Sequence, residues 1–111
     1  MDYYTKYMPY PEDLSIFSFS STEIDGANGY MCELRSGVEL PSLLIIPFEY
    51  NGLPVISYKG YSGSNTYKSN VKEVLIPPSI LSLDGYSFQN FTNLTSIEIP
   101  NSVTSLGDYC F

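Results

Sequence analysis

The chain has 111 residues, with 12 acidic against 5 basic side chains and a formal net charge of −7, which fits a single acidic domain. Because such a chain offers no basic patch for phosphates, we expect neither nucleic acid nor an anionic membrane as a partner. Histidine is absent, and the two cysteines, Cys32 and Cys110, lie far apart with no metal or redox spacing. We therefore predict no enzymatic activity, no metal and no cofactor.

Residues 1–14 are rich in tyrosine and proline and show no helical period. Pro9 and Pro11 discourage both a helix and a central strand, so we predict an extended arm. The segment has neither the basic nor the apolar region of a signal peptide. No stretch of the sequence reaches the roughly 20 apolar residues of a membrane span, so we expect no membrane insertion.

Residues 15–40 predict a β-hairpin. The segment SIFSFSSTEI is rich in β-forming residues, and Ile16, Phe17 and Phe19 are its apolar positions. The sequence DGANG supplies a tight turn, and YMCEL follows as the return strand. We interpret the hairpin as an N-terminal cap over the apolar end of the repeats that follow.

Residues 41–70 have the features of a degenerate first repeat. The segment LLIIP matches VLIP and IEIP further along the chain, and GYS also recurs. Asn51-Gly52 is a turn signal, and the extra residues at 50–54 and 63–70 are expected in loops. Gly63 stands where a phenylalanine stands one repeat later, so either Tyr67 fills that space or this layer is looser.

Residues 71–93 and 94–111 are two copies of one pattern, the second truncated. VKEVLIPPSILSLDGYSF returns 23 residues later as LTSIEIPNSVTSLGDYCF. A fixed period of this length is typical of repeats that stack and bury their apolar faces against their neighbours. The apolar positions lie two apart, which predicts short parallel strands at about 43–46, 73–76 and 96–99.

Four apolar positions of these copies are expected among the most buried side chains: Leu83, Phe88, Ile97 and Leu106. The aspartates Asp84 and Asp108 are interpreted as turn residues, not as a carboxylate pair. The recurring serines at 79, 82, 102 and 105 are interpreted as small, hydrogen-bonding side chains that a tight coil needs.

The pattern L-x-x-I-x-I-P-x-S-V-x-S-L-G-x-x-x-F over residues 71–111 resembles the BspA-like (Treponema pallidum-type) leucine-rich repeat family. The segment IIPFEYNGLPV is similar to the usual entry unit of that family. The resemblance implies a mainly β, right-handed leucine-rich-repeat solenoid with parallel strands on one face and short extended or 3₁₀ segments on the other. Family members usually carry many more repeats, so we expect the N-terminal part of a longer protein, or a short relative that pairs its open end.

The resemblance also implies a secreted or cell-surface protein that takes part in adhesion. The expected partner is a protein or glycan ligand on host or microbial surfaces. A second hypothesis is a structural or assembly domain, which self-associates as a homo-oligomer or caps a longer repeat array. An unpaired strand edge and a bare apolar layer at residues 94–111 would favour this association.

Side chains that point outward from the three predicted strands form the candidate interaction surface. With Val74 and Ile76 pointing inward, the outward positions form a partly apolar column that becomes acidic at its end. An exposed apolar patch indicates a partner or a cover, and here the cover would be the Tyr-rich arm or a neighbouring copy. The six residues of this surface are Leu43, Ile45, Glu73, Leu75, Ser96 and Glu98.

Overall fold

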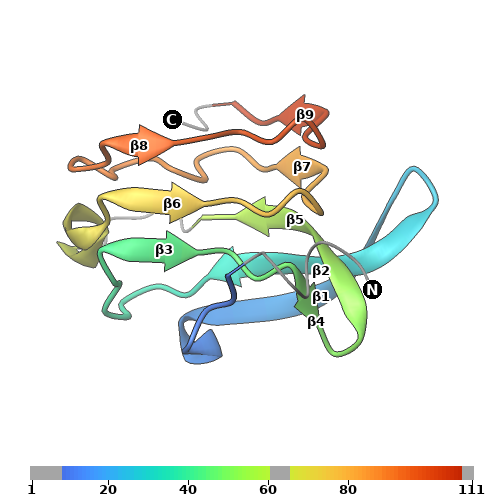
Figure 1. Ribbon diagram of the computed structural model, residues 1–111, viewed down its shortest axis with the longest axis horizontal. Coiled ribbons are helices and arrows are strands. Elements are labelled where there is room, and N and C mark those ends of the chain that lie inside the picture. Colours follow the sequence, from blue (N-terminus) through green and yellow to red (C-terminus); the bar gives the residue numbers. More distant parts are fainter. Residues whose placement is uncertain (1–8, 61–65, 109–111) are drawn as a thin grey trace.

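The computed structural model describes residues 9–60 and 66–108, and the fold is mainly β (Figure 1). Within these ranges two 3₁₀ helices accompany nine strands. In chain order they are η1 (Leu14–Ile16), β1 (Phe17–Ile24), β2 (Ala27–Leu34), β3 (Leu43–Ile45), β4 (Glu49–Tyr50), β5 (Leu53–Lys59), η2 (Thr66–Asn70), β6 (Glu73–Leu75), β7 (Ser82–Leu83), β8 (Ser96–Ile97) and β9 (Ser105–Leu106).

The predicted hairpin is confirmed as the antiparallel pair β1–β2. Its turn residues Asp25 and Gly26 have φ values of 49° and 88°, the left-handed conformation that a two-residue hairpin turn needs at both positions. Asn51 and Gly52 form a turn of the same conformation between β4 and β5, with φ values of 53° and 86°. The insertion at 50–54 therefore forms a second small hairpin instead of a loop.

Two parallel ladders stack the repeats. Strands β3, β6 and β8 form a three-stranded sheet in that order, and all neighbours run parallel. The six-stranded sheet has the order β1-β2-β5-β7-β9, with β4 paired to β5. Figure 1 shows the two ladders side by side, one rung per repeat. The parallel strands predicted at 43–46, 73–76 and 96–99 are confirmed, each one or two residues shorter than expected.

Hydrogen bonds join residues of consecutive repeats that lie 23 positions apart in the sequence. The backbone N–H of Thr95 donates to Lys72 O at 2.9 Å, and that of Thr104 donates to Leu81 O at 2.8 Å. Both threonine hydroxyls donate to the same carbonyls, at 2.9 and 3.3 Å. The equivalent backbone N–H groups one repeat earlier, those of Lys72 and Leu81, donate to Ser42 O and Ile56 O, both at 2.8 Å. Each repeat is thus joined to the previous one by the same backbone bonds, and residues 94–111 add two threonine hydroxyls.

The core lies between the two ladders. The middle residues of β3 and β6 point inward, and four consecutive residues of β5, Val55–Tyr58, are buried. Leu44 and Val74 come from the three-stranded sheet, and Val55, Tyr58 and Leu83 come from the other. Burial of each of the aliphatic side chains among them, Leu44, Val55, Val74 and Leu83, stabilises the fold by about 1.5–3 kcal/mol. Phe88 is 3 % exposed, so the predicted burial of Leu83 and Phe88 is confirmed.

The predicted burial of Ile97 and Leu106 is wrong. Ile97 is half-buried and Leu106 is 55 % exposed, whereas Leu83, its equivalent one repeat earlier, is fully buried. The cause is the position in the ladder: β7 lies between β5 and β9, whereas β9 pairs with β7 alone among the described strands. A layer in the middle of the stack is covered on two sides, and the last described layer on one.

Close backbone contacts and buried polar groups join the end of β5 to the segment that follows β7. A Cβ at Gly60 would overlap the backbone carbonyl of Ser87, so only glycine fits there. The Ser87 hydroxyl donates to Asp84 O at 2.7 Å and is 3.3 Å from Tyr58 O. The expected hydrogen bonding of the repeat serines fails at Ser79 and Ser102, whose buried hydroxyls meet no acceptor in the described residues. Their small size, rather than a hydrogen bond, suits the coil.

The inserted segment before the second repeat buries a lysine instead of a tyrosine. Tyr67 is 39 % exposed, so it does not fill the first layer, and Gly63 lies outside the described residues. Lys68 is fully buried instead. Its Nζ donates to Gln89 O at 3.2 Å and lies 5.8 Å from the centre of the Phe91 ring. Burial lowers the pKa of this ammonium group.

Candidate interaction surface

The candidate residues lie on one face of the sheet β3-β6-β8, which we call the outer face. Leu44 and Val74 point into the core at 0 % and 2 % exposure, while the preceding Leu43 is 40 % exposed. The pleat therefore turns odd and even positions to opposite sides, as the sequence predicts. All six candidate residues are exposed or half-buried: Leu43, Ile45, Glu73, Leu75, Ser96 and Glu98.

The strand register brings these residues into columns. Leu43 is the partner of Glu73, which is the partner of Ser96, and Ile45 is the partner of Leu75. Partners on neighbouring parallel strands lie about 4.8 Å apart, so Ile45 and Leu75 form a continuous apolar strip. Their role in binding stays a prediction.

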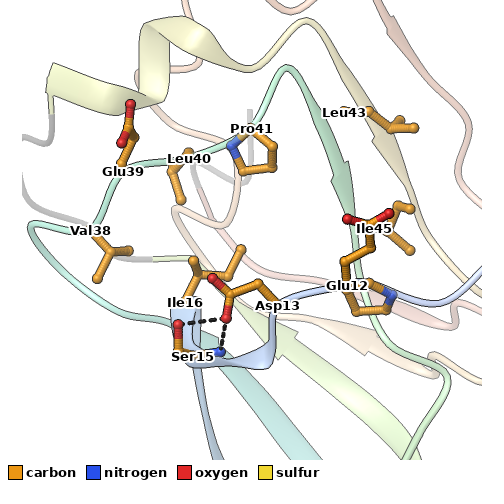
Figure 2. Close-up of a pocket in the computed structure, with 11 residues that line it drawn as sticks. Glu12, Asp13, Ser15, Ile16, Val38, Glu39, Leu40, Pro41, Leu43 and Ile45 are labelled. Atoms are coloured by element: carbon orange, nitrogen blue, oxygen red, sulfur yellow. Dashed lines mark hydrogen bonds between the residues drawn. The ribbon is translucent and has the colours of Figure 1, made fainter.

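A groove of about 730 Å³ lies beside the outer face at the β3 end of the sheet (Figure 2). Its walls come from three segments far apart in the sequence: the chain before β1, the connection between β2 and β3, and β3 itself. The sequence does not predict this groove. The lining residues are Pro11, Glu12, Asp13, Ser15, Ile16, Val38, Glu39, Leu40, Pro41, Leu43 and Ile45.

The groove combines an apolar interior with an acidic margin. Ile16 and Leu40 are buried and Val38 is half-buried, whereas Glu12 and Glu39 are exposed. Figure 2 shows these side chains arranged around a common space, together with Leu43 and Ile45 of β3. Two of the six predicted surface residues, Leu43 and Ile45, therefore belong both to the outer face and to the groove.

Asp13 holds the turn at the start of the groove. Its carboxylate accepts hydrogen bonds from the Ser15 backbone N–H at 2.9 Å and from the Ser15 hydroxyl at 2.6 Å. This is the N-cap arrangement of η1, in which a side-chain oxygen satisfies a free backbone donor. Both hydrogen bonds favour the charged carboxylate and lower the pKa of Asp13.

The described part of the N-terminal arm is anchored beside the groove and leaves it open. The Tyr10 ring packs edge-on against Phe48, with 5.3 Å between ring centres, and its hydroxyl donates to Glu49 O at 2.7 Å. Burial and the nearby Glu49 carboxylate raise the pKa of Tyr10. Since Leu43 remains 40 % exposed, residues 9–14 do not cover the outer face. Residues 1–8 of the predicted arm lie outside the described residues.

An aromatic cluster, also unforeseen, stiffens the hairpin. Phe19 and Tyr50 stack with 3.8 Å between ring centres and nearly parallel planes. Tyr30 meets the Tyr50 ring edge-on at 5.1 Å, and its hydroxyl accepts a hydrogen bond from the Asn51 side chain at 3.3 Å. The cluster joins β1 and β2 to the small β4–β5 hairpin, so it fixes the two hairpins against each other.

No group of three His, Cys, Asp or Glu side chains in residues 9–60 and 66–108 could hold a metal ion. Cys32 is a free, buried thiol, and Cys110 lies outside the described residues. Burial, with a smaller effect of Glu33, raises the pKa of Cys32 far above its ordinary value, so it is a poor nucleophile. No helix among the described residues is long and apolar enough to cross a membrane.

Comparison with known proteins agrees with this architecture. Residues 61–111 match a family model described as BspA type leucine rich repeat region (6 copies). Residues 61–111 therefore carry leucine-rich repeats of the BspA type. No curated protein matches the sequence significantly.

A crystal structure of a T. pallidum leucine-rich repeat protein is similar to the fold, with a TM-score of 0.51 and 15 % sequence identity. The match covers 83 % of this chain and 51 % of that one, so this BspA-type chain spans about half the length of its structural neighbour. At this identity the likeness concerns the fold alone. Leucine-rich repeats are generally protein-interaction modules, and the BspA-type family is typically surface-associated.

Proposed function

We propose that this chain is a non-enzymatic recognition module of a cell-surface or secreted protein, and that it binds a protein ligand through its outer face. The observation that carries the proposal is the apolar strip of Ile45 and Leu75 beside the 40 % exposed Leu43, in a chain of net charge −7. An apolar strip on an otherwise acidic surface is typical of a contact site for another protein.

We also propose that the stacked repeats form a right-handed solenoid, with residues 15–40 as its N-terminal cap and residues 1–14 as an arm. Residues 41–70, 71–93 and 94–111 are its successive units. The proposal is supported by the two parallel ladders and by the parallel pairing of β2 with β5, which adds the hairpin to the end of one ladder. Such a scaffold presents a rigid sheet face to a large partner.

A binding experiment with matched leucine variants tests the outer face. Leu75→Asp places a charge in the apolar strip, while Leu53→Asp makes the same change at a 44 % exposed leucine in the β4–β5 hairpin. We expect the wild-type chain, coated on beads, to bind immobilised extracellular-matrix proteins or microbial cells. Leu75→Asp should remove this binding and Leu53→Asp should retain it.

Two results would contradict the proposed function. Equal binding by both leucine variants would show that the outer face is not the contact. Loss of binding after periodate treatment of the target surface, with unchanged binding after protease treatment, would identify a glycan instead of a protein as the ligand. Circular dichroism spectra of the variants serve as the control for folding.

A second function, self-association, is favoured by the exposure of the last described layer. Leu106 is 55 % exposed in β9, which pairs with β7 alone among the described strands. Bare strand edges and apolar layers are templates for another chain. Light scattering over a concentration series tests this hypothesis: a mass that rises with concentration, and that Leu106→Asp returns to the monomer value, would support an assembly domain. A constant monomer mass would exclude it.

A further inference from the structure

Strand β3 has one edge to which none of the described strands is paired, called the unused edge. Among the described strands it pairs with β6 alone, through the bonds from Glu73 N to Ser42 O at 3.2 Å and from Ile46 N to Leu75 O at 3.0 Å. Successive backbone groups along a strand point to opposite sides. Because the backbone groups of Ser42 and Ile46 point to β6, those of Leu43 and Ile45 point the other way.

The unused edge borders the groove. Leu43 and Ile45, whose N–H and C=O groups point away from β6, are the two β3 residues that line it. Figure 2 shows the groove between β3 on one side and the segments that carry Glu39 and Asp13 on the other. The edge therefore offers alternating donors and acceptors at strand spacing along a space of about 730 Å³.

The charge of the groove selects the kind of occupant. Its margin carries the carboxylates of Glu12, Asp13 and Glu39, and no lysine or arginine is among the lining residues. A second copy of this chain, with net charge −7, would bring carboxylates against carboxylates. A cationic segment is attracted, and the apolar interior leaves room for aliphatic side chains between the charges.

We propose that the groove binds an extended basic polypeptide segment, which adds as a further strand to the free edge of β3. The segment alternates basic residues, which meet the acidic margin, with aliphatic residues, which enter the groove. Main-chain hydrogen bonds to Leu43 and Ile45 supply affinity, and the alternate side chains supply specificity. This inference rests on the proposed function in one respect only, that the ligand is a protein.

A fluorescein-labelled peptide of sequence Lys-Val-Lys-Ile-Lys-Val-Lys is a suitable probe, with binding followed by fluorescence polarisation. N-methylation of either the aliphatic or the lysine residues blocks the N–H groups on one edge of the peptide strand. We expect one of the two methylated peptides to bind at least about tenfold more weakly than the unmethylated peptide. The other should differ from it by about twofold or less. This comparison does not depend on the folding of any protein variant.

Two pairs of protein variants locate the contact. Leu43→Pro removes the edge N–H and leaves the bonds to β6, whereas Leu43→Ala keeps that N–H and removes the side chain. We expect the proline variant to bind about tenfold more weakly than wild type, and more weakly than the alanine variant. Glu39→Gln should weaken binding about threefold at low salt, while Glu23→Gln, the same change in β1 outside the groove, should not.

The outcomes separate this inference from the proposed function. Equal effects of the two methylated peptides, or equal binding by Glu39→Gln and Glu23→Gln, would overturn strand addition, and the outer face would still be tested by Leu75→Asp. If removal of residues 1–8 strengthens peptide binding more than about tenfold, the chain's own N-terminal segment is the occupant and the inference is wrong. If the two methylated peptides differ as expected but the chain binds no target surface, the inference about the groove stands and the proposed adhesion function is contradicted.

Discussion

Leu83 and Leu106 allow one packing prediction to be tested with a built-in control. They occupy the same position in consecutive repeats and are register partners on β7 and β9. Leu83 is fully buried and Leu106 is 55 % exposed. Replacing each with alanine therefore removes the same atoms from two environments that differ mainly in burial.

The expected magnitudes follow from that difference. Alanine lacks three carbon groups of leucine, each worth about 0.8 kcal/mol of transfer free energy when buried. At Leu83 an enclosed cavity adds to this loss, so we expect the free energy of unfolding to fall by about 3–4 kcal/mol. At Leu106 less than half of the transfer term applies and no cavity is enclosed, so we expect a fall of about 1 kcal/mol or less.

Urea unfolding followed by far-ultraviolet circular dichroism measures both losses, and unchanged m-values would show that the unfolding transition is comparable. Losses that agree within about 0.5 kcal/mol would refute the reasoning, because Leu106 would then be as well covered as Leu83. Light scattering on the same samples shows whether a second copy provides that cover.

Three further predictions follow from packing at single sites. Phe88→Ala should lower the free energy of unfolding by about 3–5 kcal/mol in the same urea assay, because the ring is 3 % exposed and stacks 5.5 Å from Tyr58; a loss below about 1 kcal/mol would contradict its place in the core. Gly60→Ala should cost about 1–3 kcal/mol, since the added methyl group meets a backbone carbonyl, and an unchanged melting temperature would be inconsistent with that contact. In a Cys110→Ser variant, the raised pKa and burial of Cys32 should slow its reaction with Ellman's reagent at pH 8 at least about 100-fold relative to the urea-unfolded chain; equal rates would show that the thiol is accessible.

The ladder strands and the hairpin were predictable because local signals and the repeat agree there. The spacing of Val74 and Ile76 identifies the inward side of β6, and the 23-residue copy transfers that assignment to the next repeat. The turn at Asp25-Gly26 follows from the conformations that these residue types tolerate. Such signals are contained within a few residues of sequence, so they need no knowledge of tertiary contacts.

Burial at the last repeat could not be predicted in the same way. The pattern places Leu106 and Leu83 at equivalent positions, but their exposure depends on what lies on each side of the layer, which the pattern does not contain. Lys68 shows the same limit: a lysine is expected at the surface, and only the tertiary arrangement brings Gln89 O and the Phe91 ring to its side chain.

The candidate site was half predictable for the same reason. The outward positions of β3, β6 and β8 follow from alternation, and the six predicted residues are exposed or half-buried, while their role in binding stays a prediction. The groove is built from three segments that are far apart in the chain, and its acidic margin of Glu12, Asp13 and Glu39 carries no motif. The abundance of carboxylates was a signal of charge, but not of where the charges gather.

The threonine bonds between repeats have a consequence for the order in which the chain acquires structure. Thr95 and Thr104 each find their acceptor 23 residues earlier in the sequence, and the N–H of Gly107 donates to Leu83 O, 24 residues earlier. During synthesis, each new layer therefore meets partners that have already left the ribosome. The β1–β2 hairpin precedes these repeats in the sequence and is closed by local contacts, so it is available as a template before they are synthesised. Growth from such a template exposes only one unpaired layer at a time, which keeps the nascent chain's aggregation-prone edge short.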